Sequence, residues 1–385
     1  MKKIYTILFI AGIFMHSNAQ NINNSEKEKS KVHISGYSQI DYNQDLNKDL
    51  RKNGILDVHR LVMLFGYQYN DRTSFITEIE FEHVKEVFVE QAHINYRITN
   101  GLSFRGGLIL IPMGIINEFH EPPTFNGVER PNVDNTIVPT TWREIGAGFY
   151  GNLSNLSLKY QLYLVNGFSS YNNGGLIKGE NGLRSGRQKG AKSIISSPNI
   201  SAKVNYYGIG GLNIGIAGYF GNTQSSMLHG IDKTDQAKLQ QADSTVIGVN
   251  MIGMDISYLK KGFGIKGQLV FASLNNALEY NTFTGKDLGS KMLGHYIELS
   301  YDLFNKFDFN GQKLVPFIRY EKYNTHQDHY DSSLINDLYN RNDLSMGLGW
   351  WMSPGAVLKA DYQILKSAGN DNSVNRINLG IGIMF

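Results

Sequence analysis

The feature that most constrains the fold is an alternation of apolar and polar residues that recurs along almost the whole chain. In the final stretch NRINLGIGIMF (375–385), every second residue from Ile377 to Phe385 is apolar. A period of two is typical of a β-strand with one face in apolar surroundings and the other in water. We identify sixteen such runs and therefore predict an all-β protein. The predicted strands are 31–42, 56–69, 73–83, 86–98, 102–110, 144–151, 155–165, 199–207, 211–220, 245–259, 262–274, 290–304, 312–324, 343–352, 355–366 and 374–385.

The connections between these runs fall into two classes that alternate along the chain. Short links contain tight-turn residues such as Asn100-Gly101 and Ser353-Pro354-Gly355. The other links are mostly long and polar, the longest being 111–143, 166–198 and 221–244. A soluble sandwich or solenoid does not require this alternation, whereas an outer-membrane barrel has turns at one end and loops at the other. The pattern predicts a 16-stranded antiparallel transmembrane β-barrel with short periplasmic turns and long outer loops.

The N-terminal stretch MKKIYTILFIAGIFMHSNAQ has two lysines, an apolar run and a small-residue site before Gln20. This order is typical of a secretory signal peptide, and the apolar run is too short for a transmembrane helix. We therefore expect a signal peptide at 1–19, a barrel domain at 20–385 and a location in the bacterial outer membrane. The chain has no cysteine, which excludes a disulfide framework and thiol catalysis.

The long link 111–143 is unusual because it contains five of the eight prolines of the chain. Proline fixes φ and restricts the residue before it, so these residues stiffen a loop that has few strand hydrogen bonds. A 16-stranded barrel encloses a lumen wide enough to need narrowing. We hypothesise that this third outer loop folds inward as a constriction, the alternatives being an ordinary surface loop or a contact between subunits. Its candidate pore residues are Glu118, His120, Glu121, Glu129, Arg130 and Asp134.

Strand parity indicates which charged side chains face the lumen, and it gives similar numbers of acids and bases. Three acids, Glu78, Glu80 and Glu82, crowd the run 73–83. Opposite charge across a narrow, low-dielectric constriction would produce a strong transverse field. We therefore hypothesise a basic wall that faces the acidic loop and favours anions. The residues of this wall are Arg97, Arg105, Lys159 and Lys203.

The segments LILIPMGIINEFHEP (108–122) and NGVERPNVDNTIVPTTWREIGAGFYG (126–151) resemble bacterial outer-membrane porins of the phosphate-selective porin (porin O and P) family. This resemblance implies a 16-stranded channel, a third loop that folds back into the barrel and a homotrimer. The terminal aromatic residue Phe385 resembles the assembly signal of outer-membrane barrels. The balanced lumen departs from the arginine- and lysine-rich pattern of the family, which favours a general or differently tuned porin.

We therefore expect a water-filled channel for passive diffusion of small hydrophilic solutes or ions, including anions such as phosphate. The expected partners are outer-membrane lipid and lipopolysaccharide, the transported solutes, the barrel assembly machinery and further copies of the chain. No nucleic-acid partner, enzymatic activity, metal or cofactor is expected. Two alternatives remain open, namely a barrel with a surface adhesion or assembly role and a barrel with a hydrolase site on its rim.

The basic segment between 178 and 192 contains glycines but lacks the Gly-Lys-Ser/Thr order of a phosphate-binding loop, so we reject a nucleotide site. The positive charge of this segment also suits contact with anionic lipopolysaccharide at the cell surface. His326, Asp328 and His329 lack the spacing of a metal site on a helix or strand. Trp350-Trp351 is interpreted as interface girdle or pore lining, with a sugar-stacking slide kept as an alternative.

Overall fold

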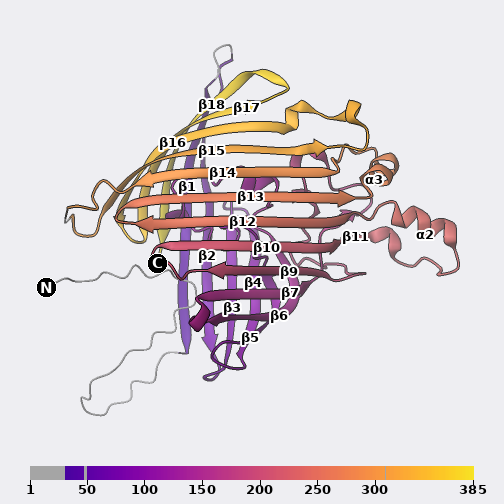
Figure 1. Ribbon diagram of the computed structural model, residues 1–385, viewed down its shortest axis with the longest axis horizontal. Coiled ribbons are helices and arrows are strands. Elements are labelled where there is room, and N and C mark those ends of the chain that lie inside the picture. Colours follow the sequence, from indigo (N-terminus) through magenta and orange to yellow (C-terminus); the bar gives the residue numbers. More distant parts are fainter. Residues whose placement is uncertain (1–30, 47–49, 308) are drawn as a thin grey trace. The chain divides into compact units, whose positions relative to one another are not determined.

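The computed structural model describes residues 31–46, 50–307 and 309–385, so the predicted signal peptide lies outside the described residues. Within these residues, sixteen strands form one closed antiparallel barrel, as predicted (Figure 1). The barrel strands are β1 (Val32–Leu46), β2 (Ile55–Gln68), β3 (Thr73–Glu82), β4 (Glu86–Arg97), β5 (Ser103–Leu110), β6 (Arg143–Leu153), β7 (Leu158–Val165), β9 (Asn199–Tyr206), β10 (Leu212–Asn222), β12 (Gly248–Lys260), β13 (Phe263–Asn275), β14 (Lys291–Tyr301), β15 (Lys313–Asp328), β16 (Asn340–Ser353), β17 (Ala356–Ser367) and β18 (Asn370–Met384).

The barrel closes because the last strand pairs with the first. β18 runs antiparallel to β1, and the register joins Tyr37 to Met384 and Asp41 to Gly380. Beyond the strand, Phe385 and Gly36 exchange two backbone hydrogen bonds of 2.9 and 3.0 Å. Closure matters because an open sheet edge would leave backbone N–H and C=O groups without partners in an apolar medium.

The alternation in the sequence divides the strands into an outer and an inner face. On β10, β12 and β14, Ile216, Ile252 and Ile297 point outward and are more than half exposed. Their inward neighbours Ala217 and Glu298 are buried. The apolar exterior was predicted from parity, and the register of the sheet confirms it.

The loops contain the remaining short elements. β8 and β11 pair in parallel outside the barrel sheet, and Figure 1 shows α2 and α3 together at one end of the strands. Among the described residues, no helix is both long and apolar enough to span a membrane. The short elements are β8 (Ser169–Tyr171), β11 (Gln224–Ser225), α1 (Val133–Thr136), α2 (Gln236–Asp243), α3 (Ala277–Thr284), η1 (Pro122–Thr124), η2 (Ser154–Leu156), η3 (Gly179–Asn181), η4 (Arg184–Gly186), η5 (Ser226–Leu228), η6 (Ser332–Leu334) and η7 (Asp337–Tyr339).

The interior of the barrel is not uniformly polar, which corrects the expectation of a polar lumen. Inward-facing Met251 and Val270 belong to a buried apolar cluster that also contains Ile137 and Val138 of the 111–142 loop. Gly294 on β14 makes room for this packing, because a Cβ there would lie 2.8 Å from Ile137 Cδ1. Burying an aliphatic side chain of this size stabilises by about 1.5–3 kcal/mol. The hydrophobic effect therefore holds the loop against β12–β14.

Candidate functional site

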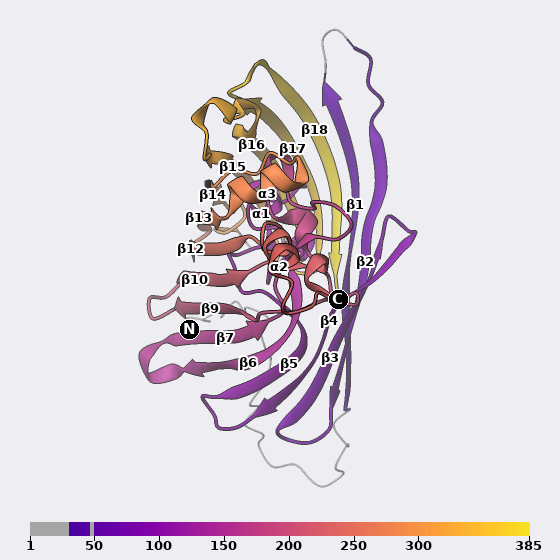
Figure 2. The same ribbon diagram turned by 90° about the vertical axis from the view of Figure 1, so that its right-hand side faces the viewer.

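The site begins with the loop of residues 111–142, which we call the constriction loop after the role predicted for it from the sequence. Figure 2, which faces the end with α2 and α3, shows α1 of this loop within the ring of strands. Asn117 is fully buried at the base of the loop and closes it. Its Nδ2 donates to the carbonyl oxygens of Ile111 (2.7 Å) and Trp142 (2.9 Å), and its Oδ1 accepts from Trp142 N (2.7 Å). The predicted inward fold of the third loop is therefore confirmed, with Asn117 holding its two ends together.

Lys359 on β17 is the strongest single anchor of the loop. Its buried Nζ donates to the carbonyl oxygens of Pro122 (2.6 Å), Phe125 (2.6 Å) and Gly127 (2.8 Å). The same ammonium lies 3.9 Å from the centre of the Phe125 ring, a cation–π distance. Hydrogen bonds from a charged donor are stronger than neutral ones. One lysine therefore fixes the backbone of the loop around η1.

Three of the four predicted acids of the loop contact polar side chains of the barrel wall. Glu118 Oε2 lies 3.4 Å from Lys203 Nζ on β9. Glu129 accepts from Asn43 Nδ2 at 2.9 Å on β1. On β13, Gln268 Nε2 donates to Asp134 at 2.8 Å.

Two of the six loop candidates, Asp134 and Glu121, also have a buried carboxylate oxygen. Asp134 is fully buried, and this burial raises the pKa of its carboxyl to about 7. Glu121 has one buried carboxylate oxygen that accepts no hydrogen bond from the described residues. Polar contacts therefore fix the loop to β1, β9 and β13, while Glu121 Oε2 and Asp134 Oδ2 are buried without a hydrogen-bond partner among the described residues.

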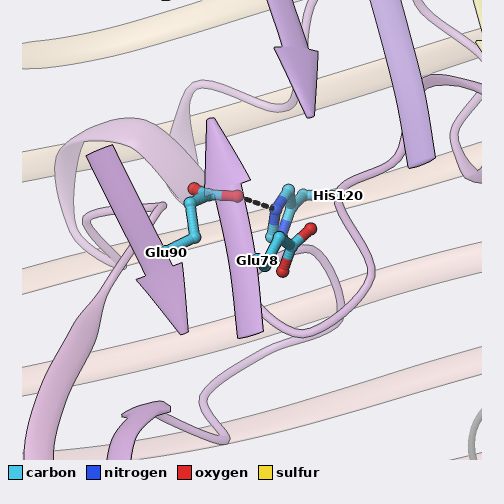
Figure 3. A group of neighbouring side chains, drawn as sticks. All are labelled: Glu78, Glu90 and His120. Atoms are coloured by element: carbon cyan, nitrogen blue, oxygen red, sulfur yellow. Dashed lines mark hydrogen bonds and ion pairs between the residues drawn. The ribbon is translucent and has the colours of Figure 1, made fainter. Parts of the chain in front are cut away.

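His120 brings the loop to β4 through a buried cluster, drawn in Figure 3. His120 Nε2 lies 3.2 Å from Glu90 Oε2, and its Nδ1 lies 3.2 Å from Asn117 O. Glu78 completes the group, whose ligand atoms lie within 4.8 Å of one another. Arg143 Nη1 is 3.7 Å from Glu90 Oε1. Because Arg143 and His120 already supply positive charge beside Glu90, we interpret the cluster as an ion-pair network and not as a metal site.

This ion pair predicts a pH-dependent attachment of the loop. Burial disfavours the charged imidazole, but Glu90 outweighs it and raises the pKa of His120 above its ordinary value of 6.5. The stabilisation is therefore complete below the unfolded value and is lost as pH rises through the raised folded value. We expect protection of loop amides against hydrogen exchange to fall in that alkaline direction, measured by mass spectrometry at constant ionic strength.

The His120→Gln variant should show weak loop protection at every pH, because glutamine cannot become charged. His229→Gln, on an exposed outer-loop histidine, is the matched control and should keep the wild-type profile. An unchanged profile in His120→Gln would show that the ion pair does not hold the loop.

The four residues of the predicted basic wall differ in burial and in the groups that they contact. Lys203 is buried and donates to Gly114 O at 2.5 Å in the constriction loop. Arg105 donates to Asn95 Oδ1 at 2.8 Å. Arg97 and Lys159 are exposed, and Arg97 donates to a carbonyl of the β2–β3 turn. Among the contacts of the described residues, those of Lys203 reach the constriction loop, and a joint role of the four residues as one wall stays a prediction.

The predicted acids of β3 all face inward, as parity indicated, and two of them meet a basic group that sequence reasoning missed. Glu80 and Glu82 line a small cavity with cations from β2, from the constriction loop and from the 166–198 loop. Arg60 Nη1 lies 3.2 Å from Glu80 Oε1. The basic residues of the 166–198 loop have no periodicity in sequence, so only their basic character could have marked them.

No protein-family model matches the chain. An uncharacterised protein of Aquifex aeolicus (strain VF5) is 29% identical over 354 residues, which cover 87% of this chain and 76% of that protein. The outer membrane channel DcaP of Acinetobacter baumannii has a TM-score of 0.60 at 12% identity and covers 92% of this chain and 97% of its own. The anion-selective porin from Comamonas acidovorans has a TM-score of 0.55 at 13% identity, covering 92% and 99%. These structural similarities show the fold.

Proposed function

We propose that this chain is an outer-membrane porin through which small hydrophilic solutes or ions diffuse passively. The observation that carries the proposal is a closed barrel with an apolar outer face and a charged interior around an inward-folded loop. The similar structures named as a channel and as an anion-selective porin support the same class of function. Closure gives the backbone N–H and C=O groups at the sheet edges hydrogen-bond partners, which a sheet in lipid requires because no water is available there.

The strand dimensions suit a membrane. β12 has 13 residues, which at about 3.3 Å per residue exceed the roughly 30 Å of a hydrocarbon core even when the strand is tilted. The outward side chains of β12, such as Ile252 and Met254, are apolar and exposed. Lipid contact would cover them, because an apolar surface gains free energy by leaving water.

The interior suggests where solutes pass. The apolar cluster closes the side of the lumen next to β12–β14 against water. The opposite side, along β2–β4, is lined by charged and hydrogen-bonding groups. We therefore infer a narrow, charged path between the constriction loop and β2–β4.

Planar-bilayer recording of the refolded protein is the test. We expect discrete open steps, with a reversal potential across a chloride gradient that favours anions, because cations outnumber acids on the charged path. A well-folded barrel without any conductance would contradict the porin proposal. The surface adhesion and rim hydrolase alternatives would then be assayed directly.

The resemblance of 108–151 to porins of the O and P family also supports a homotrimer, and the terminal aromatic residue Phe385 supports an assembly signal in the last strand. Phosphate selectivity within that family stays a prediction. The mass of the refolded protein in detergent would show whether it is a trimer.

A further inference from the structure

A pocket of about 460 Å³ lies where the ends of β10, β12 and β13 meet α2 and α3. Figure 1 shows both helices at this end of the strands. Seven of the nine lining residues have polar side chains, the others being Val246 and Gly248. We call this site the rim pocket. Its volume falls within the range of about 300–1,000 Å³ that is typical of sites for small molecules.

The floor of the rim pocket consists of three residues at the ends of neighbouring strands. Gly248 of β12 pairs with Asn222 of β10 on one side and with Asn275 of β13 on the other. Alternation along β12 places Gly248 on the same outward face as Ile252. A Cβ at Gly248 would lie 3.1 Å from Asn275 Cβ and 3.4 Å from Asn222 Oδ1. Glycine at this position therefore keeps the floor open between two amide side chains.

The walls of the rim pocket come from the two helices. α2 contributes Gln240 and Asp243, and α3 contributes Glu279. Asn276 joins the walls, because its Nδ2 donates to the carbonyl oxygens of Asp243 (3.0 Å) and Val246 (2.7 Å). The start of α3 is thereby tied to the segment that ends α2, and the pocket is formed without a ligand.

Five polar side chains of the rim pocket have no partner within the described part of the protein. None of them forms a hydrogen bond or an ion pair with another described residue. These side chains are those of Asn222, Gln240, Asp243, Asn275 and Glu279. The three amides offer both N–H donors and C=O acceptors, whereas the two carboxylates offer acceptors. A ligand can therefore use these groups without breaking a contact of the fold.

The charge of the rim pocket limits the kind of ligand. Asp243 and Glu279 are acidic, and none of the nine lining residues, all of which the structure describes, is basic. The pocket therefore disfavours anions. Within the described ranges, these two carboxylates do not belong to a group of three acids or histidines that could hold a metal ion. A ligand rich in hydroxyl groups matches the pocket better, because each hydroxyl both donates and accepts a hydrogen bond.

The position along the strands relates the rim pocket to the membrane. On the same outward face, closer to the middle of the strands, lie the apolar side chains of Phe220, Ile252 and Phe271. Amides without partners, such as those of Asn222 and Asn275, cost free energy in hydrocarbon but not in a hydrated layer. The change from apolar to amide side chains therefore marks the end of the hydrocarbon layer, and the pocket lies in the hydrated layer beyond it.

We propose that the rim pocket binds an uncharged pyranose sugar. The hydroxyl groups around a sugar ring match amides and carboxylates that surround a pocket, and the volume accommodates a whole ring. Two sources present this chemistry, namely a free saccharide and the sugar headgroup of a glycolipid in the outer leaflet. The inference goes beyond the proposed channel, because the floor of the pocket is on the outward face of the barrel and not on the lumenal face.

Saturation-transfer NMR on the refolded protein tests this binding directly. The detergent is lauryldimethylamine oxide, which has no sugar headgroup, and the probes are glucose, galactose, mannose and N-acetylglucosamine. We expect at least one of the four sugars to receive magnetisation from the protein, and we expect inorganic phosphate not to compete with it. A folded barrel that transfers magnetisation to none of the four would overturn the proposal.

Two variants locate the sugar. Gly248→Val fills the floor with a side chain that suits a strand and should weaken sugar binding at least tenfold. Asn275→Leu removes one amide and should weaken binding several-fold. Asn372→Leu, which changes an exposed asparagine of β18 outside the pocket, is the matched control and should leave binding unchanged. Sugar binding that both pocket variants retain in full places the ligand elsewhere and overturns this site.

Two further readouts separate the sources and the proposals. Lipopolysaccharide that displaces the bound sugar identifies a glycolipid headgroup as the ligand, whereas retention of the sugar identifies a free saccharide, and both results support the pocket. The two pocket variants should conduct like the wild type. A conducting barrel that binds none of the sugars overturns the rim pocket and leaves the porin. Sugar binding by a barrel without conductance supports the pocket and contradicts the channel.

Discussion

Replacing residues 119–138 with a short glycine-serine linker is expected to raise the single-channel conductance several-fold. The segment includes α1 and η1, which lie inside the barrel, while Asn117 and Trp142 remain to close the base of the loop. A 16-stranded barrel without its loop encloses a wide aqueous lumen. Conductance in a planar bilayer at fixed salt measures the effect directly.

The matched control removes 229–243, the outer-loop segment that contains α2, and should leave the conductance near the wild-type value. Retained folding of both variants is checked by the mobility shift on heating in detergent. If the shortened barrel folds and its conductance is unchanged, the loop does not limit the current.

The barrel could be predicted because the alternation of apolar and polar residues that specifies each strand is a local property of the sequence. An apolar residue at every second position, as from Ile377 to Phe385, specifies a strand and its outer face without any knowledge of neighbours. The inward position of Glu78 and Glu80 follows from the same parity, and the register agrees. The prolines of 111–142 marked the constriction loop, because stiffness is a property of the residues themselves.

Glu90 was missed because the sheet is irregular beside it. Glu78 pairs with Gln91, whereas Ile79 pairs with Val89, so Glu90 is the extra residue of a β-bulge. A bulge reverses the parity that follows it, and counting back from Arg97 therefore assigns Glu90 to the wrong face. Because of this one inserted residue, parity did not identify Glu90 as the partner of His120.

The basic cavity was unpredictable for a different reason. Arg184 and Arg187 belong to a loop whose path depends on tertiary contacts with the carbonyls of Pro139 and Thr140. Loops lack the periodicity that relates sequence to position. The apolar part of the interior could not be predicted either, because both faces of the strand that contains Met251 are apolar in places. Both features depend on packing between segments that are distant in sequence, and local sequence patterns do not predict such packing.

Lys359→Met is expected to lower the free energy of unfolding by about 3 kcal/mol or more, because three loop carbonyls lose a charged donor and each unpaired buried group costs about 1–3 kcal/mol. Methionine keeps the length and the apolar stem of lysine, so the packing beside Phe125 changes little. The measurement is the urea unfolding midpoint in lipid vesicles, together with hydrogen exchange of residues 122–127, which should lose protection selectively.

Lys159→Met separates this effect from the general loss of a lumenal charge. Lys159 also faces the lumen, but it is exposed, and its ammonium lies 5.7 Å from the centre of the Tyr207 ring. Its replacement should change stability by less than 1 kcal/mol, as expected for an exposed charge. Equal destabilisation by both variants would mean that the lumen requires positive charge in general, whereas a selective effect at Lys359 would show that one buried ammonium holds the constriction loop in place.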